Sequence, residues 1–344
     1  MIRRPPRSTL SSSSAASDVY KRQVNSNIAI LEVDNPPVNP LSSGVRAGLA
    51  EFIEEANSDE SVKGIILTGA GRSFIAGADI SEFGKSFDGP DLNSALRAIE
   101  FSKKPVLAAI NGTALGGGLE TALVCNYRMG TNKAIVGLPE VNLGLLPGAG
   151  GTQRLPRLVG PSQALKMMLS GTPLSAKKAL EQGILDAISE NSLIDDAIAF
   201  LQDKIDLSEH PKVRDKNEKL LEARGSENVL AEAKALAAKT RRGQFAPGQI
   251  IACVEAAINE DDFEVGLKKE SDYFLECLMN PQREAMIHIF FGERAASKIA
   301  DIPKDTPLMP INAAGIVGSG TMGGGIAMNP VSYTHLTLPT KRIV

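Results

Sequence analysis

The sequence predicts an α/β protein that carries its chemistry in glycine-rich loops. Short apolar segments alternate with amphipathic segments in the first 205 residues, which is typical of strands that alternate with helices. Two glycine clusters, at 112–118 and 144–151, lie among these segments, and loops of this kind commonly carry functional groups. Beyond about residue 206 the chain becomes rich in Glu, Lys, Ala and Leu, a composition that favours solvated helices.

The predicted elements of the first part follow in chain order. Residues 28–33 alternate apolar and polar side chains, as a half-buried strand does, and an Asn-Pro-Pro sequence ends the strand. Residues 44–56 place apolar side chains at helical intervals. The apolar runs 62–68 and 105–110 predict two further strands, and the second leads through glycines into a predicted helix that contains Glu120.

The second part of the chain is predicted to be helical. Residues 216–240 form one helical block and residues 247–299 form another. The proline-punctuated segment 302–310 then marks a domain boundary. Aromatic rings at helical spacing favour a core position over a binding surface, and here they are Phe263, Tyr273, Phe274, Phe290 and Phe291.

The two ends of the chain differ in character from its middle. Residues 1–23 are rich in Arg and Ser and lack the apolar stretch of a secretory signal, so we expect a non-native or disordered segment, with a transit peptide as the alternative. Residues 331–344 continue no earlier pattern, and we expect a non-native tail. Between these ends we expect a catalytic α/β domain over 24–205, a helical linker region over 206–309 and the start of another domain over 310–330.

Composition excludes several classes of protein. A chain of 344 residues that is 43% hydrophobic can bury one large core, or one core with a smaller unit appended. The net charge of −3 gives no basic footprint for nucleic acid. The three cysteines and three histidines have no paired spacing, so we expect neither a disulfide framework nor a metal site. No apolar run approaches the roughly 18–20 residues of a membrane span.

Two glutamates, Glu120 and Glu140, each lie in a glycine-rich frame. Glycines at the start of a helix let backbone N–H groups approach a carbonyl oxygen that becomes an oxyanion, although a tight packing turn would look the same. One carboxylate could act as a base on water, while the other, with its pKa raised by burial, gives a proton to carbon. Helix capping for Glu120 and surface solvation for Glu140 are the alternatives.

At this point four ordered motifs resemble the crotonase (enoyl-CoA hydratase/isomerase) superfamily over roughly residues 25–205. They are Phe-Ile-Ala-Gly-Ala-Asp-Ile at 74–80, the segment 111–120 that ends in Glu120, the segment around Glu140, and Pro-Gly-Ala-Gly-Gly-Thr-Gln-Arg at 147–154. The resemblance implies a ClpP-like spiral of ββα units. It also implies an acyl-CoA thioester as substrate and no cofactor for hydration, because CoA is part of the substrate.

The resemblance also implies roles for individual residues. The oxyanion hole would consist of the N–H groups of Ala78 and Gly117. Glu120 would activate water and Glu140 would protonate the α-carbon. We expect the two carboxylates to face each other across a water-sized gap, with both N–H groups pointing into the same cavity. The remaining substrate-binding positions would be Ala76, Gly77, Asp79, Ile80, Gly116, Pro139 and Gly148.

A Gly-x-Gly-x-x-Gly pattern at Gly318, Gly320 and Gly323 follows an apolar segment, and we expect residues 310–330 to form a strand and the opening of a helix. It resembles the first turn of a 3-hydroxyacyl-CoA dehydrogenase domain, which follows a crotonase domain in multifunctional β-oxidation proteins. The chain therefore looks like the N-terminal part of such a protein, truncated at the start of its Rossmann domain. No Asp or Glu occurs after Asp305, so the acid that would hold the NAD ribose is missing. We expect NAD to be a cofactor only of the full-length parent.

The leading functional hypothesis is hydration of trans-2-enoyl-CoA to 3-hydroxyacyl-CoA in fatty acid β-oxidation, with Δ3–Δ2-enoyl-CoA isomerase activity. An isomerase-only enzyme and an inactive fragment of a multifunctional protein are the alternatives. The resemblance further implies self-association or a thiolase partner. It implies a cytoplasmic location in a bacterium and a peroxisomal one in a eukaryote.

Overall fold

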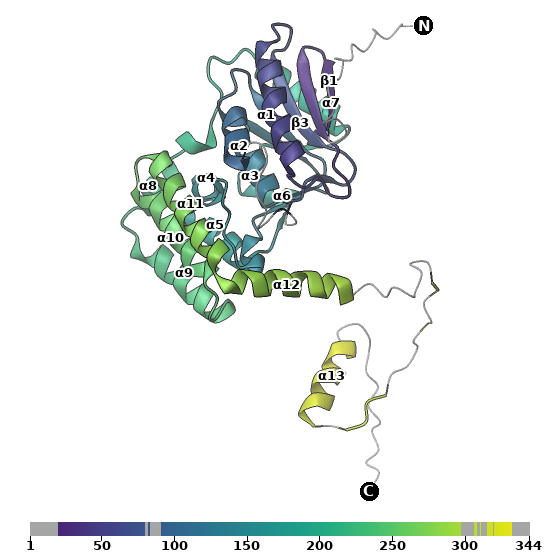
Figure 1. The fold of residues 1–344 in the computed structure, drawn as a ribbon, viewed down its shortest axis with the longest axis vertical. Helices are drawn as coiled ribbons and strands as arrows, with labels where there is room; N and C mark the ends of the chain where they lie inside the picture. The colour runs from purple at the N-terminus through teal and green to yellow at the C-terminus, as the bar shows by residue number, and fades with distance from the viewer. Residues whose placement is uncertain are drawn as a thin grey trace. The chain divides into compact units, whose positions relative to one another are not determined.

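The chain divides into two compact units, Met1–Glu293 and Arg294–Val344, and each is described by itself. Figure 1 shows the ribbon of the computed structural model. The first unit contains all the strands of the described chain and helices α1 to α11, with most of α12. The residues that the structure describes are 20–79, 82, 91–296, 306–307, 310, 315–318 and 320–331.

A six-stranded sheet forms the centre of the first unit, in the order β1-β2-β3-β5-β7-β10. Only β1 is antiparallel to its neighbour, and the other strands run parallel. Parallel strands are usually covered on both faces, and these strands are correspondingly apolar. Their bounds are β1 Tyr20–Asn25, β2 Ile28–Val33, β3 Gly64–Gly69, β5 Val106–Ile110, β7 Tyr127–Thr131 and β10 Ala187–Ser189.

A second sheet of four short strands has the order β4-β6-β8-β9. It takes one strand from each successive repeat: β3 continues into β4, β5 into β6, and β7 into β8. A helix follows each of these strand pairs, so the chain advances by ββα units and the predicted fold class is confirmed. The bounds are β4 Ser73–Ile75, β6 Thr113–Leu115, β8 Ile135–Gly137 and β9 Leu174–Ser175, with α2 Leu92–Glu100, α3 Gly117–Val124 and the 3₁₀ helix η2 Glu140–Leu143 after the repeats.

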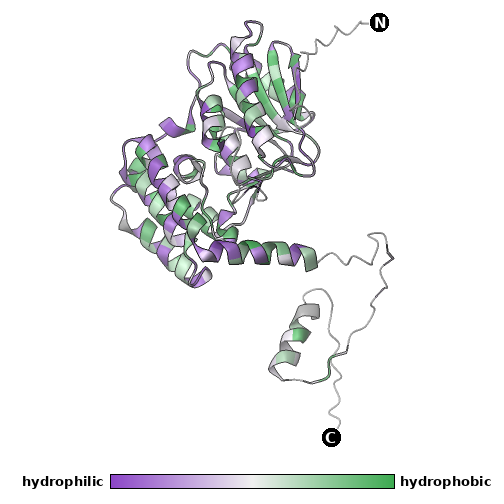
Figure 2. Cartoon of the chain, in the orientation of Figure 1, coloured by the Kyte–Doolittle hydropathy of each residue, from purple (hydrophilic) through white to green (hydrophobic). Residues whose placement is uncertain are grey.

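The central strands of the large sheet are buried on both faces. Successive side chains of a strand point to opposite faces, and every residue of β3 is buried. In β3, Ile65 and Leu67 belong to the main core, which includes α1, Ser43–Ser58. Ile66 belongs to a second cluster on the other face, where it packs with Ile198 of α7, Leu193–Gln202. Figure 2 shows the apolar colouring concentrated in this sheet.

The remaining helices of the first unit include the predicted helical region. Within it, α10 packs against α4, α5, α9 and α11 (Figure 1). The expectation that its aromatic rings are core is confirmed for Phe263, which is buried, and is wrong for Phe291, which is 48% exposed. The bounds are α4 Gly151–Val159, α5 Pro161–Ser170, α6 Ala176–Glu181, η3 Val213–Asp215, α8 Glu218–Ala223, α9 Glu227–Thr240, α10 Ala246–Asn259, α11 Phe263–Met279 and α12 Pro281–Ala296.

The first strand corrects one expectation about the N-terminal end. We placed residues 1–23 outside the fold, yet residues 20–23 belong to β1, which pairs along its whole length with β2. Arg22 of β1 forms an ion pair with Glu55 of α1, and its guanidinium lies over the ring of Phe52. A basic sequence that reads as foreign is therefore held by the adjacent strand and helix.

The second unit contains α13, Thr321–Val331. A helix opening was predicted near this position. The apolar strand predicted before it is absent from residues 315–318, and residues 311–314 lie outside the described residues. Most of the predicted linker at 302–310 and the tail after Val331 lie outside them as well.

A buried ion pair joins α2 to α4. Arg154 donates to both carboxylate oxygens of Glu100, from Nε at 2.9 Å and from Nη2 at 2.7 Å. The two side chains are 4% and 1% exposed. Two parallel bonds of this kind fix the geometry of both partners. Arg214 also reaches Oε2 of Glu100, at 3.4 Å, so removal of Arg154 leaves the buried carboxylate with one longer ion pair.

Arg154→Met is therefore expected to lower the free energy of unfolding by about 3–5 kcal/mol, measured by urea denaturation. The matched control is Arg97→Met. Its ion pair with Glu264 joins side chains that are 55% and 47% exposed, so the change should cost less than about 1 kcal/mol. Equal losses for the two variants would show that burial of the Glu100 pair is unimportant.

Candidate active site

Two loops with little side-chain bulk meet at the start of α3. Gly117 begins this helix, so its N–H is among the first-turn groups that have no acceptor within the helix. Ala78 lies in the loop after β4, where it bridges to Leu41. A Cβ built on Gly117 would lie 3.7 Å from the Ala78 nitrogen, so these two peptides are close neighbours.

Glycine is required at two positions of this helix start. Gly116 has φ of +55°, which L side chains rarely adopt, and a Cβ there would lie 2.8 Å from Oε1 of Glu140. Gly118 packs directly on β4, because its Cβ would lie 1.9 Å from the carbonyl oxygen of Ile75. The bare backbone thus brings α3 against β4 and leaves room for the Glu140 carboxylate.

Glu120 points from the first turn of α3 toward the turn that opens α4. Its side chain is buried, and Oε1 accepts hydrogen bonds from the N–H groups of Ala149 and Gly151, each at 2.8 Å. Burial raises the pKa of Glu120, and the two N–H bonds oppose this rise because they favour the ionised form. Glu120 is therefore a buried carboxylate whose negative charge is stabilised by two backbone N–H groups.

Glu140 begins η2 and has the opposite environment. Its Oε2 is buried and accepts no hydrogen bond from the part of the chain that the structure describes. Burial and then the negative charge of Glu120 raise the pKa of Glu140 well above its usual range. The environment of Glu140 therefore favours the protonated acid more strongly than the environment of Glu120 does.

The other predicted substrate positions surround these groups. The N–H of Gly116 donates to the carbonyl oxygen of Gly137 at 2.9 Å, and the carbonyl oxygen of Gly77 accepts from Leu41 at 2.9 Å, so both loops are pinned. Pro139 directly precedes Glu140. Of the remaining positions, Gly148, Ala76 and Asp79 are half-buried, and Ile80 lies outside the described residues.

Two residues near this site were not predicted from the sequence: Glu270 and Phe274 of α11. The Phe274 ring would meet a Cβ on Gly148 at 2.5 Å, so α11 lies against the glycine turn. Glu270 is 1% exposed and binds the same turn. Gly266, Glu270 and Phe274 are spaced four apart, which puts them on one helix face, and this spacing is the signal that could have found them.

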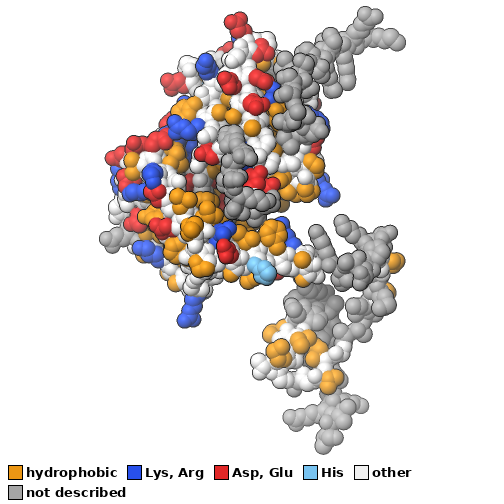
Figure 3. All heavy atoms as spheres, viewed as in Figure 1, with side chains coloured by type: hydrophobic (Ala, Val, Ile, Leu, Met, Phe, Trp, Pro, Cys, Tyr) orange, Lys and Arg blue, Asp and Glu red, His pale blue; other side chains and the backbone are white. Residues whose placement is uncertain are grey.

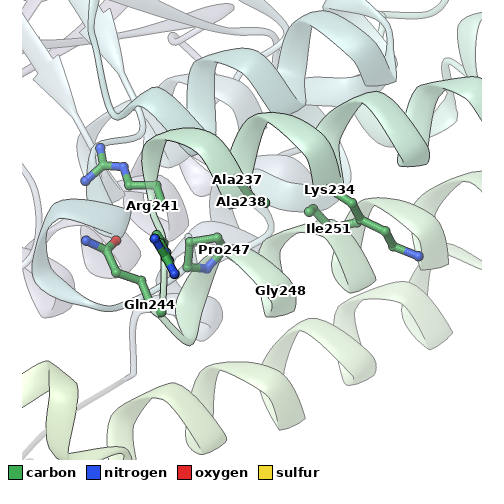
Figure 4. A pocket seen from close by; sticks show the side chains of 10 residues that line it. Lys234, Ala237, Ala238, Arg241, Gln244, Pro247, Gly248 and Ile251 are labelled. Carbon is green, nitrogen blue, oxygen red and sulfur yellow. The ribbon is translucent and has the colours of Figure 1, made fainter.

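A groove of about 400 Å³ lies between α9 and α10 (Figure 4). Its lining includes Lys234, Arg241 and Gln244, and none of the predicted site residues. The Arg241 guanidinium already donates to the carbonyl oxygens of Leu169 and Ser170. The lining contains no Asp or Glu, so the groove lacks the carboxylates that the predicted chemistry needs.

The described residues include no group of three His, Cys, Asp or Glu side chains that could hold a metal ion. No helix within the described ranges is both long and apolar enough to cross a bilayer. On the face shown in Figure 3, acidic, basic and hydrophobic side chains are intermixed. The exposed large hydrophobic residues of α11 and α12 include Leu275, Met279 and Ile289.

The glycine pattern of the second unit fits only part of a dinucleotide site. Gly318 and Gly320 precede α13, and Gly323 lies in its first turn. This turn could present N–H groups to a phosphate. The strand before it is absent where the structure describes the chain, and no acid follows Asp305 to hold a ribose.

The ββα spiral brings two bare peptides and two glutamates in unlike environments into one region of the fold. The chain belongs to the enoyl-CoA hydratase/isomerase family, whose sequence profile matches residues 23–242. The predicted resemblance is confirmed.

Several relatives are multifunctional proteins. The chain is 37% identical over 320 residues to the peroxisomal bifunctional enzyme of Cavia porcellus, covering 91% of this chain and 43% of the relative. It is 37% identical over 335 residues to the fatty acid oxidation complex subunit alpha of Shewanella loihica, covering 93% of this chain and 47% of the relative. The chain thus spans less than half the length of these relatives.

Solved structures share the fold. An enoyl-CoA hydratase subunit from Geobacillus kaustophilus matches with a TM-score of 0.51 and 29% identity, over 80% of this chain and 95% of that protein. Carnitinyl-CoA hydratase from Mycobacterium avium matches with a TM-score of 0.58 and 27% identity, over 80% of this chain and 96% of that protein.

Gly118→Ala is expected to destabilise the protein by about 1–3 kcal/mol or more, because its Cβ would meet backbone that cannot move aside. The control is Gly292→Ala in α12, where nothing lies within 4 Å of the new Cβ and a gain of up to about 1 kcal/mol is expected. Urea unfolding measures both changes. An unchanged stability for Gly118→Ala would mean that α3 does not pack so closely on β4.

Proposed function

We propose that the chain hydrates trans-2-enoyl-CoA thioesters to 3-hydroxyacyl-CoA, with Glu120 as the base and Glu140 as the acid. The observation that carries this proposal is the unlike environment of the two carboxylates. Glu120 receives two N–H bonds that favour its ionised form, whereas the buried Oε2 of Glu140 accepts none from the described residues. An addition of water needs one group of each kind.

In the proposed reaction, a water between the two carboxylates gives a proton to Glu120 while its oxygen forms a bond to the β-carbon. The double-bond electrons move toward the thioester carbonyl, and the α-carbon takes a proton from Glu140. The sum is one water added across the double bond. A proton that passes from Glu120 back to Glu140 restores both groups.

The carbonyl oxygen gains negative charge during this step. We place it against the N–H groups of Gly117 and Ala78, which the close approach of their loops supports. The N-terminus of α3 adds partial positive charge at the same point. Loss of one such donor typically costs about 10²–10³ in rate.

The proposed setting is fatty acid β-oxidation, in keeping with the names of the relatives. A protonated Glu140 that exchanges protons with allylic carbons would also support Δ3–Δ2-enoyl-CoA isomerase activity. The parent protein would add an NAD-dependent 3-hydroxyacyl-CoA dehydrogenase, peroxisomal in a eukaryote and cytoplasmic in a bacterium. Self-association and a thiolase partner remain part of the same proposal.

The paired N–H bonds on Glu120 argue against an isomerase-only enzyme, because isomerisation needs one proton-transferring carboxyl and no activated water. An inactive fragment would have no reason to keep Oε2 of Glu140 buried with no hydrogen-bond partner among the described residues, which destabilises the fold. Activity assays with crotonyl-CoA and with a 3-enoyl-CoA distinguish a hydratase from both alternatives.

With crotonyl-CoA, the enone absorbance should fall in the presence of the wild-type protein. Glu120→Gln should lower the hydration rate by about 10²–10⁴ and leave isomerisation of a 3-enoyl-CoA measurable, because that reaction needs no base on water. Glu140→Gln should lower both reactions by a similar factor. Full isomerase turnover by the Glu140 variant would show that another group protonates the carbon.

NAD titrated calorimetrically into the chain should give no saturable heat at submillimolar concentration. The turn before α13 offers phosphate-facing N–H groups alone, too few contacts to offset the entropy of ordering a dinucleotide. Binding of a 3-hydroxyacyl-CoA in the same experiment serves as the positive control. Tight NAD binding would mean that other residues of the chain complete the site.

A further inference from the structure

The turn that opens α4 gives its N–H groups alternately to two different carboxylates. The N–H groups of Ala149 and Gly151 donate to Glu120, each at 2.8 Å. The N–H of Gly150 donates to Oε1 of Glu270 at 2.6 Å, and that of Thr152 to Oε2 at 3.0 Å. Four consecutive peptides are thus shared between one glutamate of α3 and one of α11.

Glu270 is built into the turn and is not a surface residue. Its side chain is 1% exposed, and the carboxylate that the nearby Arg154 pairs with is that of Glu100. Its Oε2 also pairs with Oγ1 of Thr152 at 2.5 Å. A buried carboxyl is costly unless hydrogen bonds satisfy it, and here the turn supplies them.

The rest of α11 holds Glu270 in this position. Gly266, one helical turn earlier, lies so close to Gln153 that a Cβ would come within 2.3 Å of its side-chain oxygen. Phe274, one turn later, lies against Gly148. One face of α11 therefore contacts the turn and its flanking residues at three positions, each one helical turn apart. Glu270 is the middle one.

We propose that Glu270 is the positioning residue for Glu120: it fixes the peptides of the 149–152 turn, so that two of their N–H groups stay on Oε1 of Glu120 and Oε2 is left to bind the reacting water. This inference rests on the proposed hydratase function and names a residue that its reaction depends on. Glu270 itself touches neither water nor substrate in this scheme.

The groups around Glu270 determine its charge at each pH, and so how it affects the pH dependence of kcat. Burial and the charge of Glu120 raise the pKa of Glu270 to about 8, so Glu270 is largely uncharged on the acidic side of neutrality. In that range it acts on Glu120 through the turn and not through its charge. The charged and titratable groups that face it are Glu120 on α3, Glu140 on η2, Arg154 on α4 and Cys253 on α10.

The test compares Glu270→Met, Glu270→Asp and Glu270→Gln with the wild-type protein in crotonyl-CoA hydration. Met removes the acceptor and Asp withdraws it, so kcat should fall about 10- to 100-fold, with KM within about threefold of wild type. Gln keeps the length and one acceptor oxygen but places an NH2 group against the other N–H donor, so its kcat should lie between those of Met and wild type. Glu276→Met, an exposed position on the same helix, is the matched control and should behave as wild type.

The pH at which kcat falls on the acidic side of its pH profile gives a second measurement. A smaller amount of folded protein lowers kcat at every pH and does not shift this pH. Without a fixed turn, the N–H bonds that favour ionised Glu120 weaken, so the pKa of Glu120 rises and the acidic limb shifts to higher pH in the Met and Asp variants. If Glu270→Met does not fold, Glu270→Asp decides. If the wild-type protein is active and the Glu270 variants keep its kcat and its acidic limb, the role of Glu270 is overturned. If the wild-type protein fails to hydrate crotonyl-CoA, the proposed function itself is overturned.

Discussion

The hydrogen bonds from Ala149 and Gly151 to Glu120 join the parts of the structure on which the site depends. They connect α3, which begins at the bare Gly116–Gly118 backbone, to the turn that opens α4. A buried carboxylate is tolerated only if its oxygen is satisfied, so the helix and the turn cannot separate without the cost of an unpaired charge. The glycines are the structural condition for this, because a side chain at Gly151 would meet Oε1 of Glu120 at 2.7 Å.

The same constraint explains why two glutamates of similar sequence context become chemically different. Both are withdrawn from water, which favours the protonated acid in each. Backbone N–H groups oppose that tendency at Glu120, whereas the charge of Glu120 reinforces it at Glu140. The difference therefore arises from which carboxylate lies against the amide-rich turn.

The helical region is part of this arrangement and is not a detached linker. Helix α10 packs against α4 and α5, and α11 brings Glu270 and Phe274 to the glycine turn. A buried ion pair between Glu100 and Arg154 fixes α4 from the other side. The turn is thus held from α2, α3 and α11 together, which limits the conformations open to its peptides.

The sequence by itself determined the ββα core, its motif-bearing loops and the two candidate glutamates, because strand and helix periodicity and glycine frames are local patterns. It failed where the outcome depends on distant contacts. Residues 20–23 look foreign and become a strand only because β2 offers an edge. Phe291 has the spacing of a core residue, yet no residue of α12 is buried. Glu270 reads as one of many charges on a solvated helix, and only tertiary packing, which seats α11 on the 149–152 turn, turns it into a buried acceptor beside Glu120. Burial and hydrogen-bond partners set the chemistry of a carboxylate, and residues more than 100 positions apart decide both.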